Sequence, residues 1–551
     1  MSEPTEKRII RFLYIAAVLV CIKSIFTDFA FDNSYMVAMS YRHLSGDRMF
    51  LDMWEPHQTS AFLADGLMLV YRLIVPSLTG VVLFLQIVGT LLWIPTTVAA
   101  VKILGKYTDK LVACLIFVFF TVYKVKQSPF LDYAGQLILF SVWVFIFLLK
   151  YWEKRQLRFA VLAGVFTFLE VIAYPSAVFA VIPALAFLLA TDKKDRGKSV
   201  LCFILGGAVP SVMYAGYFIV RIGLDKLFET AGYIFGADSH STTPQYGPYW
   251  REMIIALAVL AASIILAWGV GAIVNKRYDV SIYSELLVFF GVIDLVIMII
   301  YRKTGVDGRY NVYFLPVMLI IAGLITYRKM TREERTIWLL GMGIALSSFA
   351  AAFMLSDLGI ITLVSYLELG GAVSFISLKY LCKDYKRVGI LFTLVLLMHR
   401  GLVVWGYGSQ GNNVLYTYEL ENVIRSGPAA GLVCTHFNKE KSLVDIHELN
   451  GMIGEDDRLM IVGPEFTDSL VYLYTKAEIA NFSTISSPIF NEVLEDYYRV
   501  NPDKYPTAVI VDSWFGQLSF PDDSYIVKWV EDNFDRVADL SYYRVYREKT
   551  D

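Results

Sequence analysis

The run Ile9-Ile-Arg-Phe-Leu-Tyr-Ile-Ala-Ala-Val-Leu-Val-Cys-Ile-Lys-Ser-Ile-Phe26 is long and apolar enough to cross about 30 Å of hydrocarbon as one helix. Similar runs recur as far as residue 405. Hydrophobic residues make up 56% of the 551 positions and only 18% are charged, whereas about a quarter of an average soluble protein is charged. Runs of this length indicate helices rather than barrel strands. The sequence therefore predicts a polytopic α-helical membrane protein.

About thirteen transmembrane helices are predicted from these runs. Lys7 and Arg8 precede the first run, which lacks a small-residue cleavage site and is typical of an uncleaved signal anchor. With the N-terminus in the cytoplasm, most basic loop residues fall inside, and the odd helix number places the C-terminus outside. The helices are expected near 9–26, 79–101, 110–123, 136–150, 157–173, 175–190, 199–220, 251–274, 283–301, 311–326, 336–356, 358–378 and 388–405.

The chain is expected to consist of a transmembrane domain (1–405), a turn-rich linker (406–413) and an outer domain (414–551). The first outer loop, 27–78, is too apolar for a solvated linker. It is expected to form short amphipathic helices in the membrane interface, with Trp54 and Tyr71 at headgroup depth.

The outer domain alternates short β-rich runs with helical patterns, which predicts a small α/β domain with a partly parallel sheet. The expected strands are Gly431–Thr435, Leu459–Val462 and Thr507–Val511. Asp512 follows the last of them and is interpreted as an exposed loop acid rather than a catalytic one.

Cysteine usage and net charge exclude other classes of protein. The five cysteines show neither a disulfide framework nor metal-ligand spacing, which favours a bacterial plasma membrane over the endoplasmic reticulum. A net charge of −2 indicates no nucleic-acid partner.

The segment Phe29-Ala-Phe-Asp32-Asn33-Ser-Tyr35-Met-Val-Ala38-Met-Ser-Tyr-Arg-His-Leu-Ser-Gly46-Asp47 directly follows the first helix, and Trp54-Glu55-Pro56-His57 lies before the second. This part of the sequence resembles the GT-C superfamily of integral membrane glycosyltransferases. Its members carry an Asp soon after helix one, followed by a Tyr-x-x-Ala-like helix, a Gly-Asp turn and a Pro-containing stretch. Members include protein O-mannosyltransferases, aminoarabinose transferases of lipid A and single-subunit oligosaccharyltransferases. Asn33 stands where many of them carry Glu.

The resemblance implies transfer of a sugar from a polyprenyl-phosphate-linked donor to a hydroxyl of a cell-surface glycan, lipid or protein. A hydroxyl is a weak nucleophile, so a carboxylate is needed as general base, and Asp32 is the candidate. Asp28 is the nearest alternative, since a shift of four residues keeps the same helical face. By the same resemblance, Asp132 is expected to orient the acceptor or to bind a divalent cation such as Mg²⁺ or Mn²⁺, although no metal signature demands one.

The phosphate leaving group needs cations beside it. Arg309 and Tyr310 match an Arg-Tyr pair that is often found at the corresponding place in relatives, so Arg309 is the first candidate for contact with the phosphate. Lys124 and Lys126 are second choices for this role.

The remaining candidates have two interpretations each. Asp47, Glu55 and His57 contact substrate or support the first loop. Glu170 lines the site or pairs within the bundle, because an acid at membrane depth is by default a functional hypothesis. The same argument applies to three further ionisable residues at membrane depth: Asp294, Glu368 and His399.

Two other functions remain open on the sequence alone. One is a transporter or flippase of lipid-linked sugars, which would place its acids at the middle of the membrane. The other is a non-catalytic scaffold that displays the outer domain.

Overall fold

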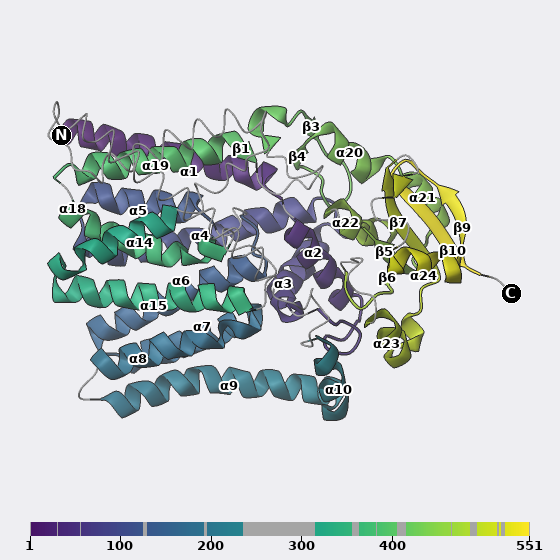
Figure 1. Cartoon of the computed structure of the whole chain (residues 1–551), viewed down its shortest axis with the longest axis horizontal. Helices are drawn as coiled ribbons and strands as arrows, with labels where there is room; N and C mark the ends of the chain where they lie inside the picture. The colour runs from purple at the N-terminus through teal and green to yellow at the C-terminus, as the bar shows by residue number, and fades with distance from the viewer. Residues whose placement is uncertain are drawn as a thin grey trace.

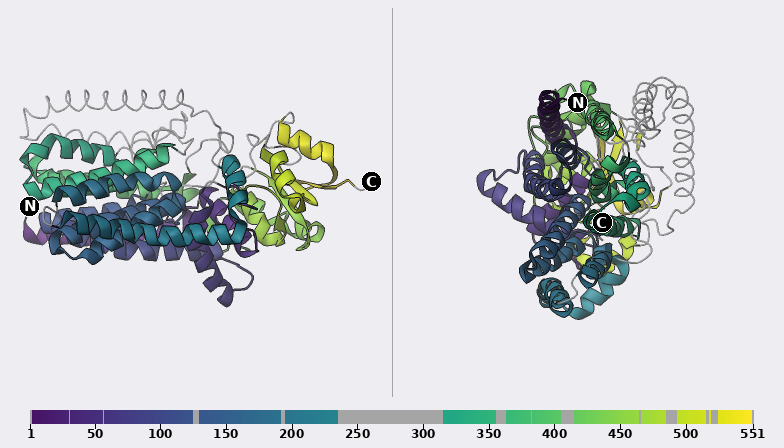
Figure 2. Two further views of the ribbon diagram at one scale, coloured as in Figure 1. Left: turned by 90° about the horizontal axis from the view of Figure 1, so that it is seen from below. Right: turned by 90° about the vertical axis from the view of Figure 1, so that its left-hand side faces the viewer.

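The computed structural model shows a long helical bundle with a small sheet at one end (Figure 1). The other views show that the bundle helices run along the long axis of the molecule (Figure 2). The structure describes residues 2–29, 31–55, 57–124, 129–191, 195–234, 315–354, 363–381, 383–404, 415–463, 466–484, 493–514, 517–518 and 524–549.

Each predicted transmembrane helix has a helical counterpart, except 251–274 and 283–301, which lie outside the described residues. The predicted helix 358–378 is divided: after residues 355–362, which are not described, it consists of short 3₁₀ and α segments that include α17. The bundle contains α1 (Glu3–Thr27), α4 (Val81–Leu104), α5 (Lys110–Val122), α6 (Tyr133–Lys154), α7 (Leu157–Ala173), α8 (Val181–Thr191), α9 (Arg196–Ile222), α14 (Leu315–Thr326), α15 (Arg332–Met354), α17 (Glu368–Ser374), α18 (Leu378–Leu381) and α19 (Tyr385–Leu402).

Within the described residues, five helices are long and apolar enough to cross a membrane. They are α1, α4 with its 3₁₀ extension to Tyr107, α6, α9 and α15.

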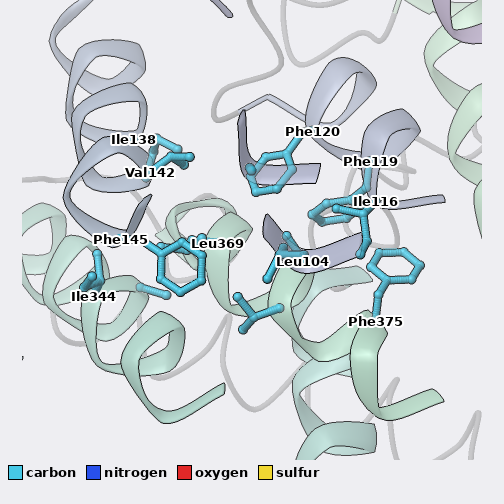
Figure 3. Close-up of a cluster of buried hydrophobic side chains, with 14 of the residues drawn as sticks. Leu104, Ile116, Phe119, Phe120, Ile138, Val142, Phe145, Ile344, Leu369 and Phe375 are labelled. Carbon is cyan, nitrogen blue, oxygen red and sulfur yellow. The ribbon is translucent and has the colours of Figure 1, made fainter. Parts of the chain in front are cut away.

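The middle of the bundle is an apolar core in which Phe119 of α5 packs against Phe375, with ring centroids 5.6 Å apart (Figure 3). Glycines allow the closest helix contacts. A Cβ at Gly164 of α7 would lie 2.0 Å from the carbonyl oxygen of Phe203, and one at Gly206 of α9 would lie 2.2 Å from that of Val161. Because lipid supplies no hydrophobic driving force between helices, such close backbone contact is a main source of their association.

The first outer loop forms α2 (Phe31–Leu44) and α3 (Ala61–Ile74), of which only α3 has the expected amphipathic character. α3 exposes Leu73 and Ile74 on one face, whereas α2 is buried between α3 and α22 (Phe466–Thr475). The prediction of an interfacial helix is wrong for α2, since apolar residues on all its sides, such as the run 35–39, require burial all round.

Trp54 also departs from its prediction, because it is buried rather than at headgroup depth. Its ring stacks on Tyr233 of α10 (Leu224–Ile234) at 4.7 Å and meets the edge of Tyr497 at 5.2 Å. Packing against two tyrosines has removed the indole from the surface.

The sheet has the order β6-β5-β7-β10-β9 and confirms the predicted α/β region with partly parallel strands. β5 (Arg458–Val462) is parallel to β6 (Glu478–Ile479) and β7 (Ala508–Trp514), with Leu459 opposite Ala508. β10 (Tyr543–Glu548) is antiparallel to β7 and β9 (Phe534–Asp539), a hairpin that the sequence pattern did not predict. The remaining elements are α20 (His436–Leu443), α21 (Ile446–Met452), α23 (Val493–Val500), α24 (Tyr525–Asn533) and the short strands β1 (Val403–Val404), β2 (Leu415–Tyr416), β3 (Asn422–Val423), β4 (Val433–Cys434) and β8 (Gln517–Leu518).

Asp512 is not an exposed loop acid, because β7 continues past it to Trp514. Its carboxylate is buried and forms an ion pair with Lys441, which also lies 3.1 Å from Asp468. Tyr543 donates a hydrogen bond to Asp468 at 3.0 Å. The cluster joins α20, α22 and two strands inside the sheet domain.

The helix ends that carry the basic residues lie together, at the end of the bundle opposite the sheet (Figure 1). They include the N-terminal ends of α1, α9, α15 and α19 and the C-terminal ends of α4 and α6. The sheet and the basic ends are therefore separated by the length of the bundle, which is the arrangement that the positive-inside pattern predicts.

Candidate active site

Asp32 lies in the first turn of α2, where the end of the bundle meets the sheet domain. The hydroxyl of Tyr133 donates a hydrogen bond to its Oδ1 at 3.1 Å, and the side chain is partly exposed. A carboxylate that a hydroxyl donor orients and that still reaches solvent can accept a proton from a bound hydroxyl.

Asp132 lies near Asp32, because the next residue in the chain, Tyr133, forms a hydrogen bond with Asp32. It is the N-cap of α6, where its Oδ1 accepts a hydrogen bond from the backbone N–H of Gly135 at 2.7 Å. Capping satisfies a donor that the helix start would otherwise leave unpaired. Asp132 therefore positions Tyr133, and through it the carboxylate of Asp32.

His57 belongs to the same cluster. Its ring stacks on Tyr133 with centroids 4.2 Å apart and 10° between planes, and it contacts Tyr174 at 4.5 Å. Thr59 donates to the carbonyl of Ile172 at 2.6 Å, which fixes the turn carrying His57 to the end of α7. The first loop and the ends of α6 and α7 thus converge on Asp32.

Glu170 is one helical turn below this aromatic cluster, since the N–H of Tyr174 bonds to its carbonyl at 2.8 Å. Its side chain is fully buried in α7 near Ser141. It lies deeper in the bundle than Asp32, so its role in lining the site stays a prediction.

Asp28 takes part in a buried ion cluster at the ends of α1 and α19 that are nearer the sheet domain. Its Oδ2 lies 2.7 Å from Nη2 of Arg400 and its Oδ1 lies 3.2 Å from Nζ of Lys23. Lys23 also donates to the carbonyls of Arg400 and Val403, at 3.2 and 2.5 Å. Two cations hold the carboxylate of Asp28, so it is poorly suited to act as a base. Of these two acids, Asp32 is therefore the better candidate for the general base.

A narrow apolar cavity of about 330 Å³ lies between α1, α4 and α5 and ends at two cations, Lys124 and Arg400. The ammonium of Lys124 sits 3.5 Å from the ring centroid of Trp93. Ile22 of α1 and Leu91 and Ile94 of α4 line the cavity and are about half exposed, so it opens sideways between these two helices. The cavity is apolar along its length and positive at the end nearest Asp28.

Asp47 and Glu55 lie in a buried ion network further toward the sheet domain. Asp47 lies 2.5 Å from Nε of Arg42 and 2.5 Å from Nζ of Lys504, and Glu55 lies 3.8 Å from Arg42. Glu55 also accepts the N–H of Thr484 at 2.8 Å, and burial raises its pKa. Of the two interpretations left open for these acids, their contacts are those of loop support.

Arg42 and Arg400 are among the charged residues of this region that sequence reasoning missed. Both are almost fully buried. A charge inside an otherwise apolar helix was a usable signal for Arg400, whereas Arg42 is one of several charges in a loop.

Several predicted site residues lie outside the described residues. They are Arg309, Tyr310, Lys126, Asp294 and Pro56. Within the part of the chain that the structure describes, no group of three or more His, Cys, Asp or Glu side chains could hold a metal ion.

No family model matches this sequence, and no curated protein matches it either. Solved structures are similar in fold. The oligosaccharyltransferase of Archaeoglobus fulgidus in complex with Zn and sulfate has a TM-score of 0.43 and 12% identity, covering 90% of this chain and 68% of that one. AglB from the same organism, with an inhibitory peptide and a dolichol-phosphate, has a TM-score of 0.40 and 12% identity over 93% and 70% of the two chains.

ArnT from Cupriavidus metallidurans, bound to undecaprenyl phosphate, has a TM-score of 0.42 and 10% identity over 97% of each chain. These similarities concern overall fold at low sequence identity. The proteins belong to the GT-C superfamily that segment 29–47 resembles.

Proposed function

We propose that this chain is a membrane glycosyltransferase that moves a sugar from a polyprenyl-phosphate-linked donor to a hydroxyl of an extracytoplasmic acceptor. The observation that carries the proposal is the placement of Asp32. Its carboxylate is held by Tyr133 at the end of the bundle near the sheet domain, four residues after Asp28, and Arg400, the ion-pair partner of Asp28, lines a cavity that opens sideways between α1 and α4.

In the proposed reaction Asp32 takes the proton of the acceptor hydroxyl as the oxygen attacks C1 of the sugar. The bond between C1 and the phosphate oxygen breaks, and polyprenyl phosphate leaves with the bonding electrons. Lys124 and Arg400 offset the charge that develops on the phosphate. Arg400 lines the cavity and also holds Asp28, so it connects the donor cavity with the start of α2.

The activity is tested by incubating the purified protein with a panel of radiolabelled polyprenyl-phosphate sugars, with and without cell-envelope acceptors. We expect one donor to be consumed, with release of polyprenyl phosphate. If no donor in the panel is consumed while the same protein, in proteoliposomes, moves a lipid-linked sugar between leaflets, the protein is a transporter instead.

The location of the acids supports the enzyme over the transporter. A transporter binds its substrate near the middle of the membrane, between repeated halves. Asp28, Asp32 and Asp132 all lie at the outer helix ends, after α1, at the start of α2 and at the start of α6.

Tyr133→Phe is expected to lower kcat about tenfold while leaving the KM for donor unchanged. Loss of the hydroxyl removes the hydrogen bond that Tyr133 donates to Asp32, whereas the ring can still stack on His57. A misoriented base loses part of the gain from general-base catalysis, which is on the order of 10²–10⁴-fold. Combined with Asp32→Asn, the substitution should have no further effect on kcat, because the two residues act as a unit. Additive losses in the double variant would show that Tyr133 acts separately.

Lys124→Met is expected to raise the KM for donor about tenfold to hundredfold, since a hydrogen bond to a charged group contributes on the order of 1.5–3 kcal/mol. The matched control is Lys110→Met, at the start of α5, whose last residue Val122 lies two positions before Lys124; this substitution should leave the KM unchanged. Equal effects from the two substitutions would remove Lys124 from the phosphate site.

A further inference from the structure

The helix α10 follows α9 at the end of the bundle near the sheet domain, and it runs across the long axis of the bundle (Figure 2). Gly223 makes the turn between the two helices with a φ of +93°, a conformation that residues with a side chain rarely adopt. The bundle helices that are long enough to cross a membrane run along that axis, so α10 lies roughly parallel to the membrane surface. The proposed transfer reaction does not use this helix.

The surface of α10 is divided into three strips, because residues four apart share a side of a helix. The first strip is buried against the rest of the protein and contains Thr230 and Ile234. The second strip is exposed and charged. It contains Asp225, Lys226 and Glu229, and the ammonium of Lys226 lies 2.8 Å from the carboxylate of Glu229.

The third strip is apolar and nevertheless exposed. Leu224 is 50% exposed and Phe228 is 72% exposed, and they lie on the same side of the helix because four residues separate them. Large apolar side chains in water forgo the free energy that their burial would release. A helix with a charged side and an exposed side of this kind is typical of helices that lie in the membrane interface.

The apolar strip of α10 continues the exposed surface of α9. That helix is long and apolar enough to cross a membrane, and it exposes Met213 near its middle and Val220 in its last turn. The exposed apolar side of a membrane-spanning helix is covered by lipid hydrocarbon. Lipid is therefore present at the end of α9 where α10 begins.

We propose that α10 lies in the membrane interface, with Leu224 and Phe228 inserted among the acyl chains and the charged strip turned toward water. Its partner is the lipid leaflet at the sheet end of the bundle. The contact requires no particular headgroup, because the opposite charges of Lys226 and Glu229 compensate each other.

Tyr233 connects this lipid contact to the rest of the protein. Its ring stacks on Trp54 of the first outer loop with centroids 4.7 Å apart, and its hydroxyl accepts a hydrogen bond from Arg499 of α23 at 2.9 Å. α10 therefore joins the membrane surface to both the first outer loop and the sheet domain. Its insertion fixes the height of these two parts above the acyl chains.

The test is spin labelling of the full-length protein in proteoliposomes, at single cysteines introduced after replacement of the five native cysteines by alanine. The labelled positions are Leu224→Cys and Phe228→Cys. We expect oxygen, which concentrates in hydrocarbon, to relax these labels several-fold more strongly than a water-soluble nickel chelate does. The corresponding depth should be about 5–10 Å into the boundary between headgroups and acyl chains.

The matched controls are Asp225→Cys and Glu229→Cys, each one position further along the helix and on the charged strip. At these positions the nickel chelate should be the stronger reagent. Strong relaxation by the chelate on both strips would overturn the proposal, by showing that both face water. Weak relaxation by both reagents at Leu224→Cys and Phe228→Cys would also overturn it, by showing that protein, such as a second copy of the chain, covers the apolar strip.

A second measurement keeps the native cysteines. Phe228→Trp and Glu229→Trp are reconstituted separately with lipids that carry bromine on their acyl chains, and the unaltered protein supplies the fluorescence background. We expect the fluorescence added by Phe228→Trp to be quenched and that added by Glu229→Trp to be largely retained. Equal quenching of the two would contradict the proposal. Both side chains are exposed, so neither substitution should disturb folding. Neither measurement depends on transferase activity.

Discussion

Asp32→Asn is expected to lower kcat for sugar transfer by about 10²–10⁴-fold, the range that a general base contributes. The amide keeps the shape of the carboxylate, and its oxygen can still accept the hydrogen bond from Tyr133. It cannot take the proton of the acceptor hydroxyl. Insertion, thermal stability and the KM for donor should therefore stay as they are, and only the chemical step should slow. Steady-state transfer with the donor identified from the panel measures the effect.

Two further variants make this result specific. Asp32→Ala should be as inactive as Asp32→Asn, because both lack the proton acceptor. Asp225→Asn, at the start of α10 on the same side of the molecule, is the control and should retain full activity. Full activity of both Asp32 variants would exclude this carboxylate as the base. Loss of activity in the control as well would point to a general effect of removing surface charge.

Arg42→Met is expected to lower the free energy of unfolding by about 3–5 kcal/mol, the cost of leaving buried acids without their partner. Arg42 is buried at the junction of α2 with the sheet domain. Its Nε lies 2.5 Å from Asp47, and its Nη2 donates to the hydroxyl of Tyr497 at 2.9 Å and to the carbonyl of Asp52. The neighbouring acids hold its pKa above the ordinary arginine value despite burial.

The matched control for Arg42 is Arg48→Met, six positions along the same loop. The guanidinium of Arg48 is 41% exposed and pairs with Asp52 at 2.9 Å. The carboxylate of Asp52 is buried but also accepts the backbone N–H of Arg48 at 2.7 Å, which Arg48→Met leaves in place, so this variant should lose less stability than Arg42→Met. Denaturant unfolding in mixed micelles compares the two variants. Equal losses of stability would show that burial of the network around Arg42 is not what stabilises the junction.

Arg42→Met should also reduce transfer, because α2 carries Arg42 near its end and Asp32 in its first turn. Loosening one end of a buried helix lets the other end move. We therefore expect a lower kcat at temperatures well below unfolding, with the KM for donor little changed.

The sequence predicted the helical bundle well because its signal is local. Each apolar run is long enough to span hydrocarbon, and burial in lipid or protein requires helices whatever the packing. It also predicted the parallel strands β5 and β7, whose runs are short and rich in β-branched residues. The hairpin β9–β10 was missed because its exposed strand β9 has few apolar residues, as in Phe534-Asp-Arg-Val-Ala-Asp539.

The errors at the first outer loop have one physical cause. An apolar segment next to a membrane helix can be buried by lipid or by protein, and its composition is the same in both cases. α2 and Trp54 are buried by the sheet domain and α10, both of which lie more than 150 residues later in the chain. α3 lacks such a cover on one face, so the interfacial interpretation stays a prediction for α3 alone.

By itself, the sequence determined that the chain is a helical membrane protein, which end of the bundle collects the basic residues, and that a carboxylate stands soon after the first helix. Only the tertiary structure decided which acid accepts a hydrogen bond from a tyrosine and which are held by cations: Tyr133 binds Asp32, Arg400 binds Asp28, and Arg42 binds Asp47. Composition fixes burial because the hydrophobic effect acts on each residue's own surface. A hydrogen bond or ion pair requires two groups within about 3 Å, and chain packing alone brings together residues so distant in sequence.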